Sequence, residues 1–357
     1  MRSDKNLQLI QVLRGIASLL VVLFHATANY SDIFHTKFLF DFFQFGSAGV
    51  DIFFVISGFI ITYTALQVLE YPKKLLSFLR RRAIRIYPTY WIIISLLLLS
   101  QVMLPHFFKT HYNFNLKNIA VTYLLFPAHT MVNGVSWTLS YELFFYFLFC
   151  FAFIIPNKKV ACSLGLLYSF VIICLPIAGY DYPSESSWAN LITFPMNVEF
   201  FMGVTVAVII TFFPKKLGLP FIIAGTFLFI IGAIISNINY QLVPNNFNRV
   251  ILFGIPSFFI ISGAVKYELT TKLQMPKLLL TIGEASYSLY LLHLPLIVAS
   301  FRLIQKLNIR NYLILHIFIF LILSFILFSA IIFYKRVEKP LINRLNSIRR
   351  IKVANEI

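Results

Sequence analysis

Long apolar runs separated by short polar segments make up most of this chain. Because a helix needs roughly 20 apolar residues to cross a bilayer core of about 30 Å, each run predicts a membrane-spanning helix. The shorter apolar stretch 119–131 contains Pro127, so we expect an interfacial or re-entrant piece there. The pattern predicts an all-α membrane bundle of about ten spans, at residues 9–29, 46–67, 87–104, 135–156, 160–179, 191–213, 217–236, 249–265, 278–301 and 312–334.

The composition supports a polytopic membrane protein. Of the 357 residues, 59% are hydrophobic and only 12% are charged, whereas soluble domains carry roughly 25% charged residues. A conventional soluble enzyme, a disordered chain and a disulfide scaffold are therefore excluded. The three cysteines, Cys150, Cys162 and Cys174, lie in apolar runs without metal-ligand spacing, so we interpret them as packing residues.

The net charge of +17 is explained by orientation in the membrane. With the N-terminus inside, 22 of the 30 Lys and Arg residues fall in cytoplasmic segments, where positive residues of membrane proteins concentrate. We therefore predict that both termini are cytoplasmic and that nucleic acid is not a partner. The first apolar run lacks a clear cleavage site, so we expect it to remain as the first span rather than to be removed as a signal peptide. We expect a single transmembrane domain over 1–334 and a short basic tail at 335–357.

Ionisable residues inside the predicted spans are functional candidates, because charges are costly there. Arg14 and His25 are eleven residues apart, which places them on one face of the first span, about 16 Å apart along its axis. Asp51, Glu142 and His293 fall at depths similar to that of His25. The sequence therefore predicts an acid–base cluster in the outer half of the membrane.

Other ionisable groups carry weaker signals. His316 is surrounded by apolar residues, so we interpret it as a structural hydrogen bonder. Glu199 and Glu284 fit structural pairing and function equally well. His106 and His111 lie in an outer loop at a spacing of five, which does not suit one helix face, and we predict no metal site.

The cytoplasmic side has a basic cluster of its own. Arg80 and Arg81 are explained as positive-inside anchors before the third span. Arg82 and Arg85 are i, i+3 neighbours if this segment is helical. Beside Arg14 they would form a site for a polyanion, because guanidinium groups match phosphate oxygens bidentately.

Six motifs follow one another along nearly the whole chain. They are LRGIASLLVVLFHA (13–26), GVDIFFVISGFIIT (49–62), RRAIRIYPTYW (81–91), SWTLSYELFFY (136–146), SYSLYLLH (286–293) and YKRVEKP (334–340). In this order they resemble the acyltransferase 3 family of integral-membrane acyltransferases, whose members acyl-modify cell-envelope glycans and other small acceptors.

The resemblance implies a membrane O-acyltransferase, most often an O-acetyltransferase, in the bacterial inner membrane. The acyl group would move from cytoplasmic acyl-coenzyme A, most often acetyl-CoA, to a hydroxyl of an extracytoplasmic envelope glycan such as O-antigen or an exopolysaccharide. The expected partners are therefore acyl-CoA, a free or lipid-linked glycan acceptor and membrane lipids.

The resemblance also implies roles for the catalytic candidates. His25 would be the general base, and Asp51 or Glu142 would orient it and support the imidazolium. His293 would be either a second acid–base group or a structural hydrogen bonder.

The donor and the acceptor would bind at opposite ends of one passage through the bundle. The donor phosphates would bind Arg14, Arg82 and Arg85, and the pantetheine arm would extend from there towards His25. Acceptor-side contacts are expected from Ser136, Trp137 and Tyr287.

Two other function classes are alternatives to an enzyme. A transporter or flippase of a lipid-linked or small polar substrate would use the intramembrane His, Asp and Glu residues as proton relays, but the sequence shows no inverted repeat. A non-catalytic scaffold for envelope assembly would tolerate loss of these charges. Release of free CoA in the presence of an acceptor distinguishes the enzyme from both.

Overall fold

The computed structural model describes residues 7–66, 71, 74–104, 114–127, 131–180, 188–210, 212–239, 247–307, 309 and 311–354. Over these residues the protein is helical and has no strand. Ten helical segments of this part of the chain are long and apolar enough to cross a membrane. The predicted all-α bundle of about ten spans is therefore confirmed.

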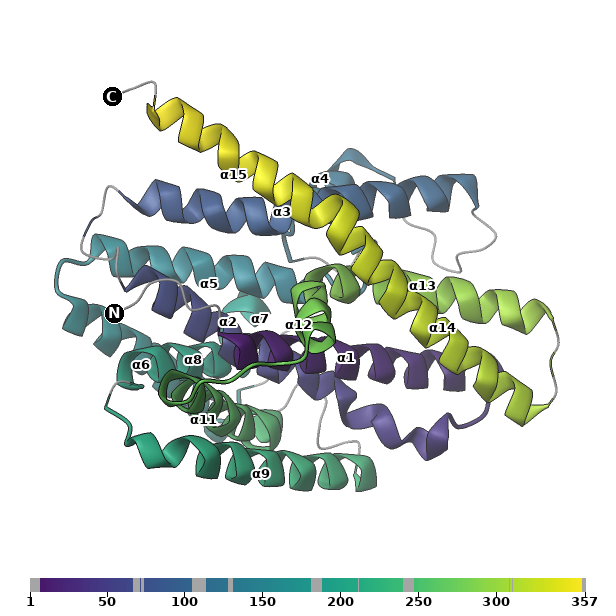
Figure 1. The fold of residues 1–357 in the computed structure, drawn as a ribbon, viewed down its shortest axis with the longest axis horizontal. Coiled ribbons are helices and arrows are strands. Elements are labelled where there is room, and N and C mark those ends of the chain that lie inside the picture. Colours follow the sequence, from purple (N-terminus) through teal and green to yellow (C-terminus); the bar gives the residue numbers. More distant parts are fainter. Residues whose placement is uncertain are drawn as a thin grey trace.

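Most of the helices run roughly parallel, and the last pair forms one long rod that crosses the others diagonally (Figure 1). The helices are α1 (Gln8–Phe34), α2 (Gly49–Ala65), α3 (Leu75–Met103), α4 (Leu116–Leu124), α5 (Trp137–Ile154), α6 (Lys158–Ile177), α7 (Trp188–Thr193), α8 (Asn197–Ile209), α9 (Gly218–Ile238), α10 (Phe247–Arg249), α11 (Ile255–Thr270), α12 (Lys277–Glu284), α13 (Ser286–Lys306), α14 (Tyr312–Phe333) and α15 (Lys339–Ala354).

The third span begins twelve residues before its predicted start at residue 87. Its helix, α3, starts at Leu75, so Arg82 and Arg85 lie within the helix rather than ahead of it. Arginine is a good helix former, and its long side chain can keep the charged group away from hydrocarbon. The basic run therefore extends the helix instead of ending it.

The ninth and tenth spans also differ from their predicted limits. The ninth begins at Ser286 rather than 278, because Ala285 interrupts the helix between α12 and α13. The tenth continues past residue 334 through a π-helical turn, Tyr334–Glu338, into α15. Both changes bring the corner between α12 and α13 close to the end of the last span.

The short apolar stretch before the fourth span forms α4, a nine-residue helix that is too short to cross the membrane. The last carbonyls of a helix have no partner within the helix. In α4 they accept hydrogen bonds from α3, where Tyr90 donates to Thr122 O (2.8 Å) and Trp91 to Tyr123 O (3.0 Å). Aromatic donors of α3 thus hold α4 in place.

Two glycines allow α2 and α8 to pack with their backbones in contact. A Cβ atom on Gly58 would lie 1.9 Å from the carbonyl oxygen of Phe200. In the same way, a Cβ on Gly203 would lie 2.0 Å from the oxygen of Val55. Small residues permit such close approach of membrane helices, so this contact fixes the position of α2, which forms one wall of the site described next.

Candidate active site

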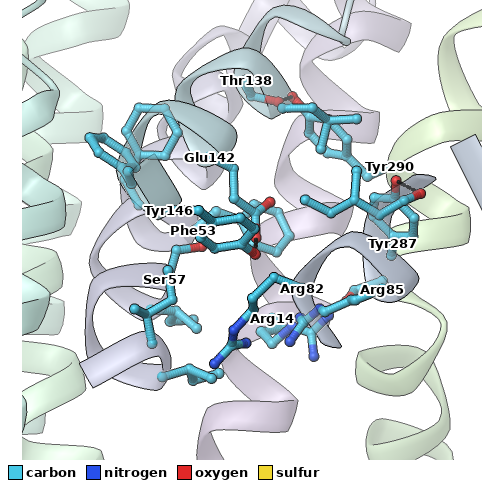
Figure 2. Close-up of a pocket in the computed structure, with 18 of the residues that line it drawn as sticks. Arg14, Phe53, Ser57, Arg82, Arg85, Thr138, Glu142, Tyr146, Tyr287 and Tyr290 are labelled. Atoms are coloured by element: carbon cyan, nitrogen blue, oxygen red, sulfur yellow. Dashed lines mark hydrogen bonds between the residues drawn. The ribbon is translucent and has the colours of Figure 1, made fainter. Parts of the chain in front are cut away.

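A pocket lies among α1, α2, α3, α5 and α13, and polar side chains from all five helices line it (Figure 2). Arg14 comes from α1, and Arg82 and Arg85 come from α3. In Figure 2 these three side chains gather at one end of the pocket, Thr138 lies at the other end, and Glu142 lies between them. The three arginines singled out in the sequence are therefore brought together.

The positive charge of this arginine cluster is not cancelled by ion pairs. None of the salt bridges within the described residues involves Arg14, Arg82 or Arg85. Arg82 donates a 2.6 Å hydrogen bond to the hydroxyl of Thr64 and lies over the ring of Phe78. Arg82 and Arg85 share one face of α3, so the cluster presents several guanidinium groups to an anion.

Two carboxylates border the arginine cluster without forming ion pairs with it. Glu142 accepts a hydrogen bond from Tyr146 and interacts electrostatically with Arg14 and Arg82. Glu338, at the end of the last span, is buried and accepts a hydrogen bond from the Ser288 hydroxyl.

The motif at 334–340 did not predict the contacts that Glu338 makes. Its carboxylate also accepts a hydrogen bond from the backbone N–H of Ser288, near the start of α13, and interacts electrostatically with Arg14 and Arg85. An acidic residue of a basic segment that becomes buried needs such partners, and this is the signal in the sequence that could have identified it. Glu338 connects the last span to both the arginine cluster and α13.

His25 and His293 form a second polar group, beside the pocket. His25 Nδ1 lies 3.2 Å from His293 Nε2, and the ring centres are 5.0 Å apart. His25 Nδ1 is also 3.0 Å from Val21 O, and His293 Nδ1 is 3.1 Å from Leu289 O. The structure thus pairs the predicted base with an imidazole from α13.

Tyr290 stands between the arginine pocket and the imidazole pair. It lines the pocket, whereas neither His25 nor His293 does. The ring of Tyr290 lies 5.8 Å from that of His293, and its hydroxyl accepts a 2.9 Å hydrogen bond from Thr138. The passage expected between Arg14 and His25 is therefore interrupted at Tyr290 in this structure.

Comparison with known proteins shows the family. A family model described as an acyltransferase domain matches residues 8–334. The chain belongs to the acyltransferase 3 family. It is accordingly a multi-pass membrane acyltransferase. The transporter and scaffold alternatives are set aside by this finding.

Several curated proteins are similar to this acyltransferase. The exopolysaccharide production protein ExoZ of Rhizobium meliloti is 26% identical over 270 residues, which cover 70% of this chain and 76% of that protein. The acyltransferase MdmB of Streptomyces mycarofaciens is 23% identical, with coverage of 72% and 70%. The O-acetyltransferase OatA of Staphylococcus aureus is 26% identical over 96% of this chain, which spans 58% of OatA. No solved structure matches.

In the acyltransferase Asp51 pairs with an arginine rather than with His25, the partner that the sequence predicted. Asp51 is fully buried and forms an ion pair with Arg249, whose NH2 group lies 2.7 Å from Oδ2 and whose Nε lies 3.0 Å from Oδ1. Arg249 also donates to Ser47 O (2.7 Å). Glu199 is fully buried beside this pair and interacts electrostatically with both members.

The predicted outer cluster is therefore divided among three places in the acyltransferase. His25 pairs with His293, Asp51 with Arg249, and Glu142 with Tyr146 beside the arginines. Depth along a span can be read from the sequence, but the direction of a side chain around the helix axis depends on packing. The side chain within hydrogen-bond distance of His25 is the imidazole of His293, whereas the sequence predicted Asp51 or Glu142.

Of the three residues predicted as acceptor-side contacts, one lines the pocket. Tyr287 lines the pocket and donates a 2.9 Å hydrogen bond to Ile86 O. Ser136 and Trp137 do not line it: Ser136 is fully buried, and Trp137 packs edge-on against Tyr141 at 5.6 Å.

The other ionisable residues of the acyltransferase lie outside the pocket. Glu284 pairs with Lys339 (3.7 Å), and His316 packs against aromatic rings. His106 and His111 lie outside the described residues. Across the described part of the chain, no three His, Cys, Asp or Glu side chains form a group that could hold a metal ion.

Proposed function

We propose that this acyltransferase moves an acyl group, most simply acetyl, from cytoplasmic acyl-CoA to a hydroxyl of an extracytoplasmic envelope polysaccharide. The observation that carries the proposal is the convergence of Arg14, Arg82 and Arg85, without ion-paired carboxylates, in one pocket. The similarity to an exopolysaccharide production protein and to an O-acetyltransferase supports the polysaccharide acceptor.

The donor's phosphates fit the chemistry of the arginine cluster. Coenzyme A carries a pyrophosphate and a separate phosphate, and guanidinium groups bind phosphate oxygens through paired hydrogen bonds. Because the surrounding bundle lowers the local dielectric, the attraction between guanidinium and phosphate is stronger there than in water. The pantetheine arm then extends along the pocket towards Thr138 and Tyr290.

The chemistry needs a base for the acceptor hydroxyl. His25 takes the hydroxyl proton as the oxygen attacks the thioester carbonyl. The carbon–sulfur bond then breaks, and the proton passes from His25 to the CoA sulfur, so that an ester and a thiol are formed. Tyr290 separates the two groups, so it moves aside to admit the thioester in this mechanism.

Release of free CoA tests the function directly. Purified protein in detergent is incubated with acetyl-CoA, with and without an envelope polysaccharide, and the thiol is measured. We expect acceptor-dependent thiol release together with acetyl esters on the polysaccharide, detected by mass spectrometry. If no acyl-CoA tested gives thiol with any envelope polysaccharide, the proposal is wrong. Chain-length variants of the acyl group then identify the donor.

A further inference from the structure

We propose that His293 is the positioning residue that fixes the tautomer of His25 and shares the positive charge that His25 acquires during acyl transfer. This inference rests on the proposed function, in which His25 is the base. The observation behind it is the 3.2 Å contact between His25 Nδ1 and His293 Nε2.

Two backbone carbonyls determine where the ring protons lie. A carbonyl oxygen only accepts hydrogen bonds, so His293 Nδ1, 3.1 Å from Leu289 O, carries a hydrogen. His25 Nδ1, 3.0 Å from Val21 O, carries one for the same reason. Both carbonyls belong to the helical turn that precedes each histidine, so each helix orients its own imidazole.

The contact between the rings then has one direction. With its hydrogen on Nδ1, a neutral His293 has a bare Nε2 that accepts from His25 Nδ1–H. The hydrogen of His25 is shared between Val21 O and this nitrogen. The Nε2 atom of His25 is therefore the nitrogen with an unshared electron pair, and it is the atom that receives the hydroxyl proton.

The contact strengthens when His25 becomes charged. After Nε2 has taken the proton, His25 Nδ1–H donates from a cation, and such charge-assisted hydrogen bonds are roughly twice as strong as neutral ones. His293 is fully buried, so water does not compete for its Nε2. The support is thus larger in the charged intermediate than in the resting state, which is the requirement for catalysis.

The carboxylates expected to do this are engaged elsewhere. Asp51 forms an ion pair with Arg249, and Glu142 accepts from Tyr146. In the familiar catalytic triad a carboxylate holds the base in its correct tautomer. Here a neutral imidazole supplies the acceptor, which avoids placing another carboxylate inside the bundle.

Two substitutions at His293 distinguish its role as a hydrogen-bond acceptor from its role in packing. His293→Gln can place its amide oxygen where Nε2 lies and accept from His25. His293→Asn can reproduce the hydrogen bond from Nδ1 to Leu289 O, but it is too short to reach His25. We expect His293→Asn to lower kcat for acceptor-dependent CoA release at least about tenfold. His293→Gln should keep most of the wild-type kcat.

Kinetic measurements distinguish the proposed role of His293 from a merely structural one. The KM for acyl-CoA should stay unchanged in both variants, because His293 does not line the donor pocket and its contact with His25 strengthens only along the reaction path. His316→Gln serves as the matched control, since it removes a bundle histidine that packs against Tyr30 and Phe38. Protein yield in the membrane and thermal unfolding are measured for all three variants.

The outcomes distinguish this inference from the proposed function. An inactive wild-type protein with every donor and acceptor would overturn the function, and the inference with it. An active wild type with equal kcat for His293→Asn would overturn the inference alone. The same applies if His293→Gln and His293→Asn lose activity equally, because the acceptor nitrogen would then not be the reason.

Discussion

Arg14, Arg82 and Arg85 place three cationic side chains in a pocket shared by five helices. A hydrogen bond to a charged group is worth about 1.5–3 kcal/mol, so each arginine that contacts a phosphate should change donor affinity measurably. In the proposed mechanism the two histidines act at a different step, because their contact with one another matters when a proton is transferred. Substitutions at the two places should therefore affect different kinetic constants.

We expect Arg82→Gln and Arg85→Gln each to raise the KM for acyl-CoA by about tenfold or more, with a smaller effect on kcat. The physical reason is loss of a phosphate contact in the ground state as well as in the transition state. Initial rates of CoA release over a range of donor concentrations measure both constants. Arg81→Gln is the control, because Arg81 is an exposed neighbour on α3 that does not line the pocket. Unchanged donor dependence in Arg82→Gln and Arg85→Gln would argue against phosphate binding by α3.

His25→Ala should abolish acylation while the protein still inserts into the membrane. Removing a general base costs about 10²–10⁴-fold in rate, and an alanine at this position of α1 removes no helix-forming tendency. Turnover is measured as acceptor-dependent CoA release, and insertion is measured as the amount of protein in washed membranes. Product formation at the wild-type rate would show that another group is the base.

At the scale of elements, buried polar contacts set how the helices are rotated and joined. The Asp51–Arg249 pair joins α2 to α10, and Glu338 joins the last span to α13. The Gly58 and Gly203 contacts hold α2 against α8. Since α2 forms one wall of the pocket, these contacts between helices determine the shape of the site.

Breaking the buried pair should be far more costly than breaking an exposed one. Asp51→Asn leaves the guanidinium of Arg249 in a buried site, where loss of one partner costs about 3–5 kcal/mol. The Lys339–Glu284 pair is half exposed, at 53% and 43%, and Lys339→Gln should cost at most about 1 kcal/mol. Denaturant unfolding in detergent compares the two free energies of unfolding. Equal losses would contradict the assignment of Asp51–Arg249 as a buried structural pair.

The sequence predicted the spans well and the partners inside the bundle only in part. Hydropathy depends on runs of residues, so the ten long helices could be found from it, as could the shorter apolar stretch that forms α4. The partners of His25 and Asp51 depend on helix rotation, which residue depth does not determine. Arg249 is the first residue of the predicted span 249–265, and it is 8% exposed. Asp51 inside a span requires a cationic partner, which is the signal that could have led to it.

At the scale of the whole molecule, an even number of spans places both ends of the bundle on one side of the membrane. From the distribution of Lys and Arg we expect that side to be the cytoplasm, as the proposed binding of cytoplasmic acyl-CoA by the arginines also requires. A green fluorescent protein joined to the C-terminus should therefore fluoresce, while an alkaline phosphatase joined there should be inactive. The opposite pair of signals would reverse the donor and acceptor sides.

In the proposed function an acyl group crosses the bilayer through this bundle. Protein reconstituted in sealed vesicles is given radiolabelled acetyl-CoA on the side of its termini and a membrane-impermeant polysaccharide on the other side. We predict label on the polysaccharide and free CoA only on the donor side, with neither product from the His25→Ala protein. Label that appears only when donor and acceptor share one compartment would contradict the account.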